Sequence, residues 1–403
     1  MPPGRGARPP ARHHAGRRLL GVPLSVIVAA ELVAAAVLLA TDRSAVGAVL
    51  VIAAAAVVAL LVVLPIGGMR LGTWLAVRLG YATRRRVFTV PPPSSPPATP
   101  PASAGEPVLL PGEVRALFPG IVATDHVTRG AGRLGLVQWH GTWTALIAVH
   151  PAQPDVLRVG TPPQLPVERI IAALTAAELP LAGVTVVSQA VVGDADRFEG
   201  GALAAISGEL GPLVRGRRTW LAVRIDPVAA GAALAARGGG AEGLSRLASA
   251  AVSRVISEVV AAGLRAESLD AADAGQAMAA ALLQPPPADD RPVRWIESLG
   301  GVASAQVHHR CFAVTSWPGR PDRPLTELAG ATAYGLTIAY EVLGVGDRPR
   351  LRGVLRLSAT SATQLERAST RLRRAARGLG VGLRPLRAQQ AAALRLTIPG
   401  GRQ

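Results

Sequence analysis

The chain has 403 residues, of which 49% are hydrophobic and 3% aromatic, and its formal net charge is +17. All of the positive charge comes from arginine, because the sequence contains no lysine. The arginines are spread along the chain and few aromatic residues could stack on bases, so this charge does not indicate nucleic-acid binding. The single cysteine, Cys311, excludes an internal disulfide and is typical of a reducing compartment.

Two long apolar runs lie near the N-terminus, at 19–40 and 45–66. Each predicts a transmembrane helix, because about 20 apolar residues cross a hydrocarbon core of about 30 Å. Since so few residues separate the runs, we expect a tight hairpin over 19–66 with both flanks on one side of the membrane. A secretory signal peptide is the alternative for the first run. It is disfavoured because the run is long, lacks a small-residue cleavage site and is followed at once by a second span.

The basic residues around the hairpin predict its orientation. Five arginines precede it, in a tail at 1–18 whose composition predicts disorder, and five follow it, whereas the connecting loop has only Arg43. The positive-inside rule then puts both termini in the cytoplasm. We therefore expect a multi-pass protein of the bacterial plasma membrane.

Glu31 lies near the middle of the first apolar run. A carboxylate at this depth is unfavourable by a few kcal/mol unless it is protonated, paired or turned toward other protein. The second run offers no cation to pair with it. We therefore expect Glu31 to contact a transmembrane helix of another subunit.

An amphipathic juxtamembrane segment is predicted at 67–90. Its leucines fall on one helical face, and Trp74 and Tyr81 are typical of anchors at a membrane interface. A helical continuation of the second span is the alternative. The segment also carries five arginines that would attract an anionic lipid bilayer: Arg70, Arg78, Arg84, Arg85 and Arg86. A Pro-rich linker at 91–107 follows, which we expect to separate the membrane from the domain.

The remaining residues, 108–403, predict a cytosolic α+β (mixed α/β) domain. A β-hairpin at 134–149 that turns at His140 and Gly141, a helix at 166–178 and a strand at 183–192 give the order ββαβ. The later elements are a strand at 219–226, helices at 243–264 and 268–283, a second linker at 285–290, strands at 307–317, 334–343 and 351–359, a short helix at 325–331, a long helix at 361–379 and final elements at 381–386 and 388–396. This order hints at a duplicated ββαβ-like unit, although no residue motif repeats with it.

The sequence contains no motif that specifies an active site. Asp194 and Asp196 form a D-x-D, a spacing that can hold a divalent cation, but a polar loop explains the pattern as well. His308, His309 and Cys311 are ligand types for soft metals, yet on a strand only His309 and Cys311 share a face. We therefore expect no catalytic residues, no metal and no cofactor.

Features along nearly the whole chain resemble one known family. They are the basic tail, the hairpin, the stretch from Trp74 to Arg78 followed by 84–86, the W-x-G-x-W pattern at 139–143, and an ending that contains Gln389, Ala392, Thr397, Pro399, Gly400 and Gly401. This layout is similar to EccE, a membrane component of the type VII (ESX) secretion machinery of actinobacteria. The resemblance implies a non-catalytic subunit that anchors and braces the secretion complex from the cytoplasmic side. It also implies EccB, the ATPase EccC, EccD and the mycosin protease as partners.

Two other classes of function stay open at this point. One is a membrane-anchored glycosyltransferase-like enzyme that uses Asp194 and Asp196 on a metal. The other is a lipid-surface adaptor that acts through its arginines.

Overall fold

The structure is a computed structural model, and it divides the chain into two compact units, Met1–Arg86 and Val87–Gln403. The residues that it describes are 18–19, 22–23, 45–63, 65–66, 69–83, 86–90, 107–127, 132–151, 165–176, 179, 181–192, 214–283, 293–317, 328, 334–343 and 350–401.

In the first unit the structure describes two helices. α2 (Ala45–Val63) lies within the second predicted span, and α3 (Leu71–Thr83) lies within the predicted amphipathic segment. Short strand pairs are also present: β1 (Arg18–Leu19) with β2 (Val22–Pro23), and β3 (Pro65–Ile66) with β4 (Met69–Arg70). Across the described ranges, no helix has both the length and the hydropathy that a membrane span requires. Most of the first predicted span lies outside these ranges, so the hairpin stays a prediction.

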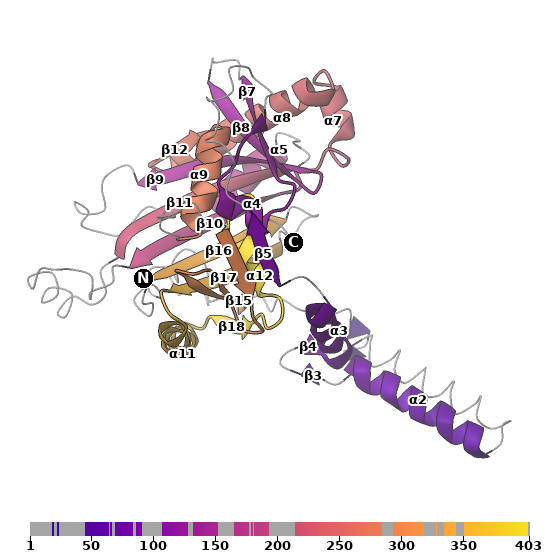
Figure 1. The fold of residues 1–403 in the computed structure, drawn as a ribbon. Helices are drawn as coiled ribbons and strands as arrows, with labels where there is room; N and C mark the ends of the chain where they lie inside the picture. The colour runs from indigo at the N-terminus through magenta and orange to yellow at the C-terminus, as the bar shows by residue number, and fades with distance from the viewer. Residues whose placement is uncertain are drawn as a thin grey trace, which may run out of the picture. The chain divides into compact units, whose positions relative to one another are not determined.

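One large antiparallel sheet forms the framework of the second unit (Figure 1). Among the described residues fourteen strands belong to it, in the order β5-β13-β14-β15-β17-β16-β10-β11-β9-β8-β7-β6, with β12 beside β9 and β18 beside β15. Their bounds are β5 (Val87–Val90), β6 (Pro107–Val108), β7 (Val122–Val127), β8 (Arg133–Trp139), β9 (Thr142–Pro151), β10 (Gly183–Val192), β11 (Val214–Ile225), β12 (Leu264–Ser268), β13 (Val293–Glu297), β14 (Val302–Ala303), β15 (His308–Ser316), β16 (Gly335–Leu343), β17 (Arg350–Ala359) and β18 (Gly382–Pro385). The prediction of a mixed α/β domain is confirmed.

The strand order is the same on both sides of the central pair, β10 and β16. Outward from β10 lie β11, β9, β8 and β7, and outward from β16 lie β17, β15, β14 and β13. The chain order agrees: α8 (Gly240–Ala261), β12 and α9 (Ala271–Ala281) follow β11, while α11 (Ala362–Gly378), β18 and α12 (Gln390–Leu396) follow β17. The two central strands also share residues, because Gly183 and Thr185 begin β10 as Gly335 and Thr337 begin β16.

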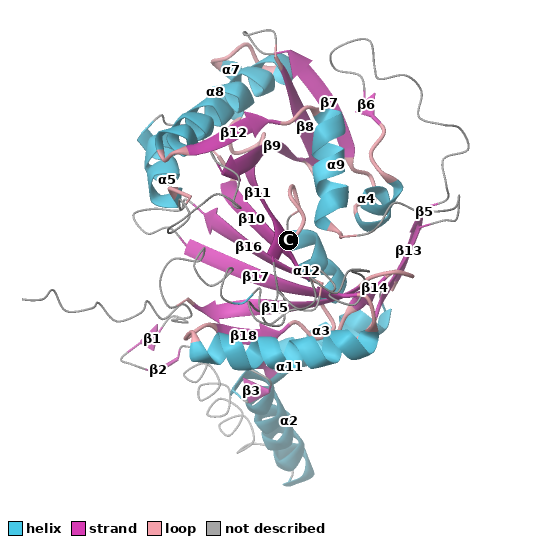
Figure 2. Cartoon of the chain, turned by 90° about the vertical axis from the view of Figure 1, so that its left-hand side faces the viewer, coloured by secondary structure: helices cyan, strands magenta, loops and turns pink. Residues whose placement is uncertain are grey.

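Helices pack on both faces of the sheet (Figure 2). α5 (Val167–Ala176), α8 (Gly240–Ala261) and α11 (Ala362–Gly378) cover one face, where the buried core includes Leu221, Leu247, Leu357 and Leu372. α4 (Gly112–Leu117), α9 (Ala271–Ala281) and α12 (Gln390–Leu396) cover the other, where the core includes Phe118, Trp139, Met278 and Trp295. A short helix, α7 (Gly231–Ala235), precedes α8. The longer helices bury apolar residues at intervals of three and four, as an amphipathic helix does.

Several predicted elements are found where the sequence placed them. β8 and β9 form the predicted hairpin, and its turn residues His140 and Gly141 have φ angles of 48° and 75°, as a two-residue turn between twisted strands requires. The predicted strand at 183–192 is β10, and the predicted long helix is α11, whose N-cap Ser361 accepts a hydrogen bond from the backbone N–H of Gln364.

Other elements differ from the expectation. β5 pairs with β13 in the sheet, so the Pro-rich stretch that follows β5 connects two strands of the second unit instead of preceding the domain. Residues 264–268 form β12, which pairs with β9, where the sequence predicted only a short break between two helices. Three predicted segments lie mostly or wholly outside the described residues: the Pro-rich stretch, the second linker and the short helix at 325–331.

A substitution at Gly135 of β8 would test how closely the start of α9 approaches the sheet. Its N–H donates a 2.8 Å hydrogen bond to the carbonyl of Leu269, and an added Cβ would lie 2.3 Å from the backbone carbon of Asp270. We expect Gly135→Ala to lower the free energy of unfolding by about 1–3 kcal/mol, because backbone cannot yield as a side chain can. Urea denaturation of the detergent-solubilised chain, followed by tryptophan fluorescence, measures this change.

Gly231→Ala is the matched control for this substitution. No atom lies within 4 Å of a Cβ added at Gly231, and its φ angle is not in the left-handed region. This variant should leave stability unchanged or raise it by about 0.4–1 kcal/mol, since alanine restricts the unfolded chain. Equal midpoints for the two variants would contradict the close approach.

Candidate functional site

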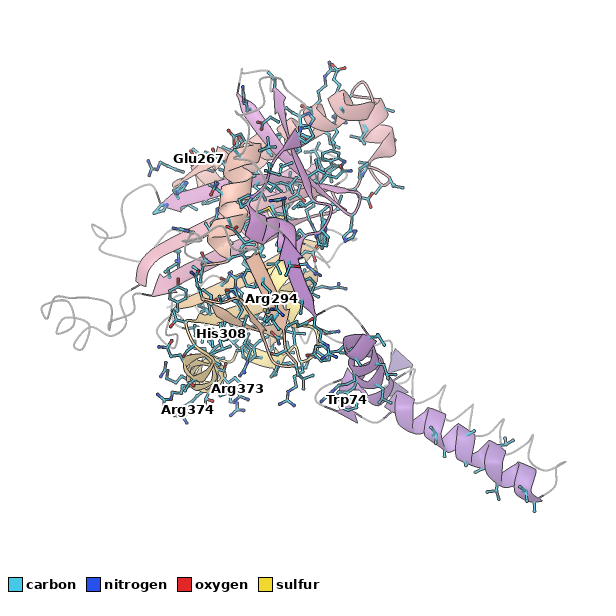
Figure 3. All side chains as sticks on the ribbon, viewed as in Figure 1. Trp74, Glu267, Arg294, His308, Arg373 and Arg374 are labelled. Atoms are coloured by element: carbon cyan, nitrogen blue, oxygen red, sulfur yellow. The ribbon has the colours of Figure 1, made fainter. Side chains whose placement is uncertain are left out.

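Three of the predicted membrane-interface residues lie along one side of α3. Trp74, Arg78 and Tyr81 are spaced by four and three residues, which places them on the same helical face. The guanidinium carbon of Arg78 lies 4.9 Å from the centroid of the Trp74 ring, and that of Arg86 lies 4.6 Å from the Tyr81 ring. Figure 3 labels Trp74 on this helix. Paired arginines and aromatic rings of this kind suit the headgroup region of a bilayer.

The remaining predicted site residues are less fully defined. Arg70 is the last residue of β4. Five residues lie outside the described ranges: Glu31, Arg84, Arg85, Asp194 and Asp196. Their roles therefore stay predictions. In the part of the chain that the structure describes, no three His, Cys, Asp or Glu residues are grouped so that they could hold a metal ion.

A buried polar cluster lies between the centre of the sheet and α9. It contains Arg356 of β17, whose side chain is wholly inaccessible to solvent. Its Nη2 donates a 2.9 Å hydrogen bond to Thr337 Oγ1 and a second one to the carbonyl of Ala281. Gln189 Nε2 donates to the same two oxygens, at 3.2 and 2.8 Å. Ala281 is the last residue of α9, where carbonyl groups lack helical partners and the helix dipole favours a cation. Burial lowers the pKa of Arg356 to about 10, so it stays charged at neutral pH.

His309 and Cys311 belong to the same cluster, on the face of β15 that the alternation of strand side chains predicts. The His309 ring stacks on Trp295, and its Nδ1 lies 2.8 Å from Ser358 Oγ. Burial, and then the charges of Arg356 and His308, hold the pKa of His309 well below its usual range. Burial raises the pKa of the Cys311 thiol to about 12, although the nearby Arg356 acts in the opposite direction. A protonated thiol is a poor nucleophile, and an imidazole that resists protonation is a poor base. Both groups are also out of contact with solvent.

Two buried carboxylates bind the N-termini of the helices on this face. Asp125 of β7 accepts a 2.7 Å hydrogen bond from the N–H of Ala271 in α9, and Glu297 of β13 accepts a 2.9 Å bond from the N–H of Ala391 in α12. A carboxylate at a helix N-terminus satisfies free N–H groups and complements the helix dipole. β7 and β13 occupy corresponding places in the two halves of the sheet, so both halves seat their last helix in the same way.

Sequence reasoning missed these residues. The pattern singled out Gln389 near the C-terminus, but Gln390 is the residue that binds the sheet. Its Oε1 accepts from the N–H of Cys311 at 2.7 Å, and its Nε2 donates to the Cys311 carbonyl at 3.2 Å. Asp125, Glu297 and Arg356 share their strands with apolar residues, and a buried charge needs a specific partner. The sequence alone does not distinguish Glu297 and Arg356 from exposed charged residues of the same strands, Arg294 and Arg352.

The buried His309 makes stability depend on pH. Above pH 6.5 this imidazole is neutral in both the folded and the unfolded chain. Below that pH, His309 binds a proton in the unfolded chain but not in the folded protein. The free energy of unfolding should therefore fall by up to about 1.4 kcal/mol per pH unit. We expect His309→Gln to remove this part of the pH dependence between pH 6.5 and 5, measured from urea midpoints. His150→Gln, at an exposed site, should keep it. Parallel pH profiles for the two variants would contradict the buried neutral state.

Comparison with known protein families gives one match. A family model described as "Putative type VII ESX secretion system translocon, EccE" matches residues 213–314. A search of curated proteins gives no match. The matched stretch runs from β11 to β15 and includes α8 and α9, whereas the motifs that suggested the family in the sequence lie outside it. The resemblance of this chain to the EccE family is thereby confirmed, over residues 213–314.

Proposed function

We propose that this chain is a structural, non-catalytic component of a type VII secretion complex. The match to the EccE family carries the proposal. The matched residues supply α8 on one face of the sheet and α9 on the other, so the similarity involves the framework of the unit. In this role the unit Val87–Gln403 braces the assembly from the cytoplasmic side and contacts EccB, EccC, EccD or the mycosin.

The chemistry of the buried cluster supports a structural role over a catalytic one. Cys311 and His309 are the groups that could act as nucleophile and base. Both are buried, and the thiol stays protonated while the imidazole stays neutral. Arg356, Gln189 and Glu297 each bind the end of a helix. No specific observation favours the glycosyltransferase-like alternative at Asp194 and Asp196.

Membrane anchoring is the second part of the proposal. The apolar runs at 19–40 and 45–66 form the hairpin in the plasma membrane, with both termini in the cytoplasm, and Glu31 contacts a helix of another subunit. The Trp74–Arg78 and Tyr81–Arg86 pairs support a position of α3 among anionic headgroups.

A duplicated unit is the third part. The repeated strand order on either side of β10 and β16 supports it, and so do the corresponding caps formed by Asp125 and Glu297. Two related halves would present two related surfaces to the partners.

Purification in mild detergent tests the secretion proposal. A tagged full-length chain should bring along the other membrane components of the secretion complex, identified by mass spectrometry, and removal of 87–403 should abolish both this recovery and secretion. Replacement of Asp194 and Asp196 by alanine should leave secretion near the wild-type level. Lost secretion in that variant, with the complex still recovered, would favour the enzyme instead.

Cysteine labelling tests the proposed orientation. Cys311 is buried with a raised pKa, so it should not react in the folded chain and introduced cysteines can be read without background. Ser44→Cys should react with an impermeant thiol reagent in intact cells, whereas Ala104→Cys should react only after lysis. The opposite pattern would overturn the orientation.

A further inference from the structure

The carboxylates of this chain are distributed far less evenly than its arginines. Residues 91–366 contain 23 arginines and 24 Asp or Glu residues, so this long stretch is nearly neutral. Residues 367–403 contain nine arginines and no Asp or Glu. The C-terminal stretch therefore carries about half of the net charge of +17, in less than a tenth of the chain.

Four of these arginines form a stripe on α11. Arg367, Arg371, Arg374 and Arg377 follow one another at intervals of four, three and three residues, and all four are exposed. The opposite side of the helix, with Leu365, Ala368, Leu372 and Ala376, is buried against the sheet. In Figure 3, Arg374 projects from α11 away from the sheet. The stripe is therefore fixed in position by the packing beneath it.

Among the described strands and helices that contact α11, little negative charge is available to balance the stripe. The carboxylate on α11, Glu366, is already bound to Arg310 of β15 at 2.6 Å. β15, β17 and β18, the strands that α11 packs against, contain no Asp or Glu. Arginines at neighbouring helical positions repel one another, so this arrangement weakens the helix unless an anionic partner is bound.

We propose that the arginine stripe of α11 binds the anionic headgroups of the membrane surface. The other exposed positions on this helix are Ala362, Thr363, Thr370 and Gly378, together with Glu366. None is a large apolar or aromatic residue of the kind that anchors a protein interface or stacks on a nucleic-acid base. A surface that recognises charge alone suits a fluid layer of anionic lipids.

The chain connectivity keeps such a surface within reach. This step rests on the proposed membrane anchoring. α3 ends at Thr83 and β5 begins at Val87, so only three residues join the juxtamembrane helix to the sheet. They can span at most about 15 Å. This connection is short enough for the second unit to reach the bilayer in which the hairpin would lie, where α11 would add a second lipid contact.

The test uses the full-length chain in lipid nanodiscs with a fluorophore on Thr370→Cys, which lies among the four arginines. Cys311 should not react, as above, so the label is specific. Nanodiscs contain a lipid with a quencher on its headgroup, in either zwitterionic phosphatidylcholine alone or a mixture with anionic phosphatidylglycerol. We expect strong quenching only with the anionic lipid, and we expect high salt to remove it. A label at Ser253→Cys on the exposed side of α8 should not respond.

Charge-matched variants make the test specific to the stripe. Replacement of Arg367, Arg371, Arg374 and Arg377 by glutamine should abolish the quenching at position 370. The control replaces four other exposed arginines by glutamine, at Arg218, Arg254, Arg265 and Arg294, and should retain it. Both variants must unfold at the wild-type urea midpoint to be compared.

Three results would overturn the proposal. They are equal quenching in both lipid compositions, equal losses in the two variants, or no quenching at all. If quenching is absent while the stripe variant loses co-purified secretion components in cells, the stripe binds an acidic protein. The nanodiscs contain no secretion component, so this readout can succeed when partner recovery fails, and the two proposals are tested separately.

Discussion

The antiparallel pairing of β10 with β16 is the interaction on which the second unit depends. These two strands lie at the centre of the sheet, where the strand order of the two halves meets. The pairing places Gln189 opposite Thr337, and Gln189 and Arg356 both donate hydrogen bonds to Thr337 Oγ1 and to the carbonyl of Ala281 at the end of α9. The register of one strand pair therefore sets the hydrogen bonds that hold a helix on the sheet. A shift by one residue would turn these polar side chains toward the leucine-rich core on the other face.

Local patterns predicted the elements whose cause is local. The hairpin of β8 and β9, the strand β10 and the helix α11 follow from alternation, turn residues and helical spacing within a few residues. The position of β5 in the sheet could not be predicted, because its partner β13 lies about 200 residues away and a Pro-rich stretch follows directly. The same holds for Asp125 and Glu297, whose partners Ala271 and Ala391 are distant in sequence. The shared Gly and Thr of β10 and β16 are too short a motif to be recognised without the topology.

The structure separates the arginines into groups with different physical roles, which composition alone could not do. Arg356 neutralises the end of a buried helix, and Arg224 is paired with Glu341 on the same face of the sheet. Arg395 of α12 donates a 2.6 Å hydrogen bond to the carbonyl of Leu117 and lies over the rings of Phe88 and Trp139. Exposed arginines, such as those on α11, can contact an anionic partner directly, whereas the buried Arg224 and Arg356 cannot. The net charge of the chain therefore does not show where cations are available at its surface.

The central position of β10 has a consequence for synthesis on the ribosome. One edge of β10 pairs with β11, which is made soon afterwards, but its other edge has no partner until β16 is made about 150 residues later. At elongation rates of roughly 5–20 residues per second this interval lasts roughly 8–30 s. During that time the nascent chain exposes a ten-residue apolar strand edge that could pair with a second nascent copy. The late completion of the sheet therefore leaves this edge of β10 open to wrong pairing for the whole of that interval.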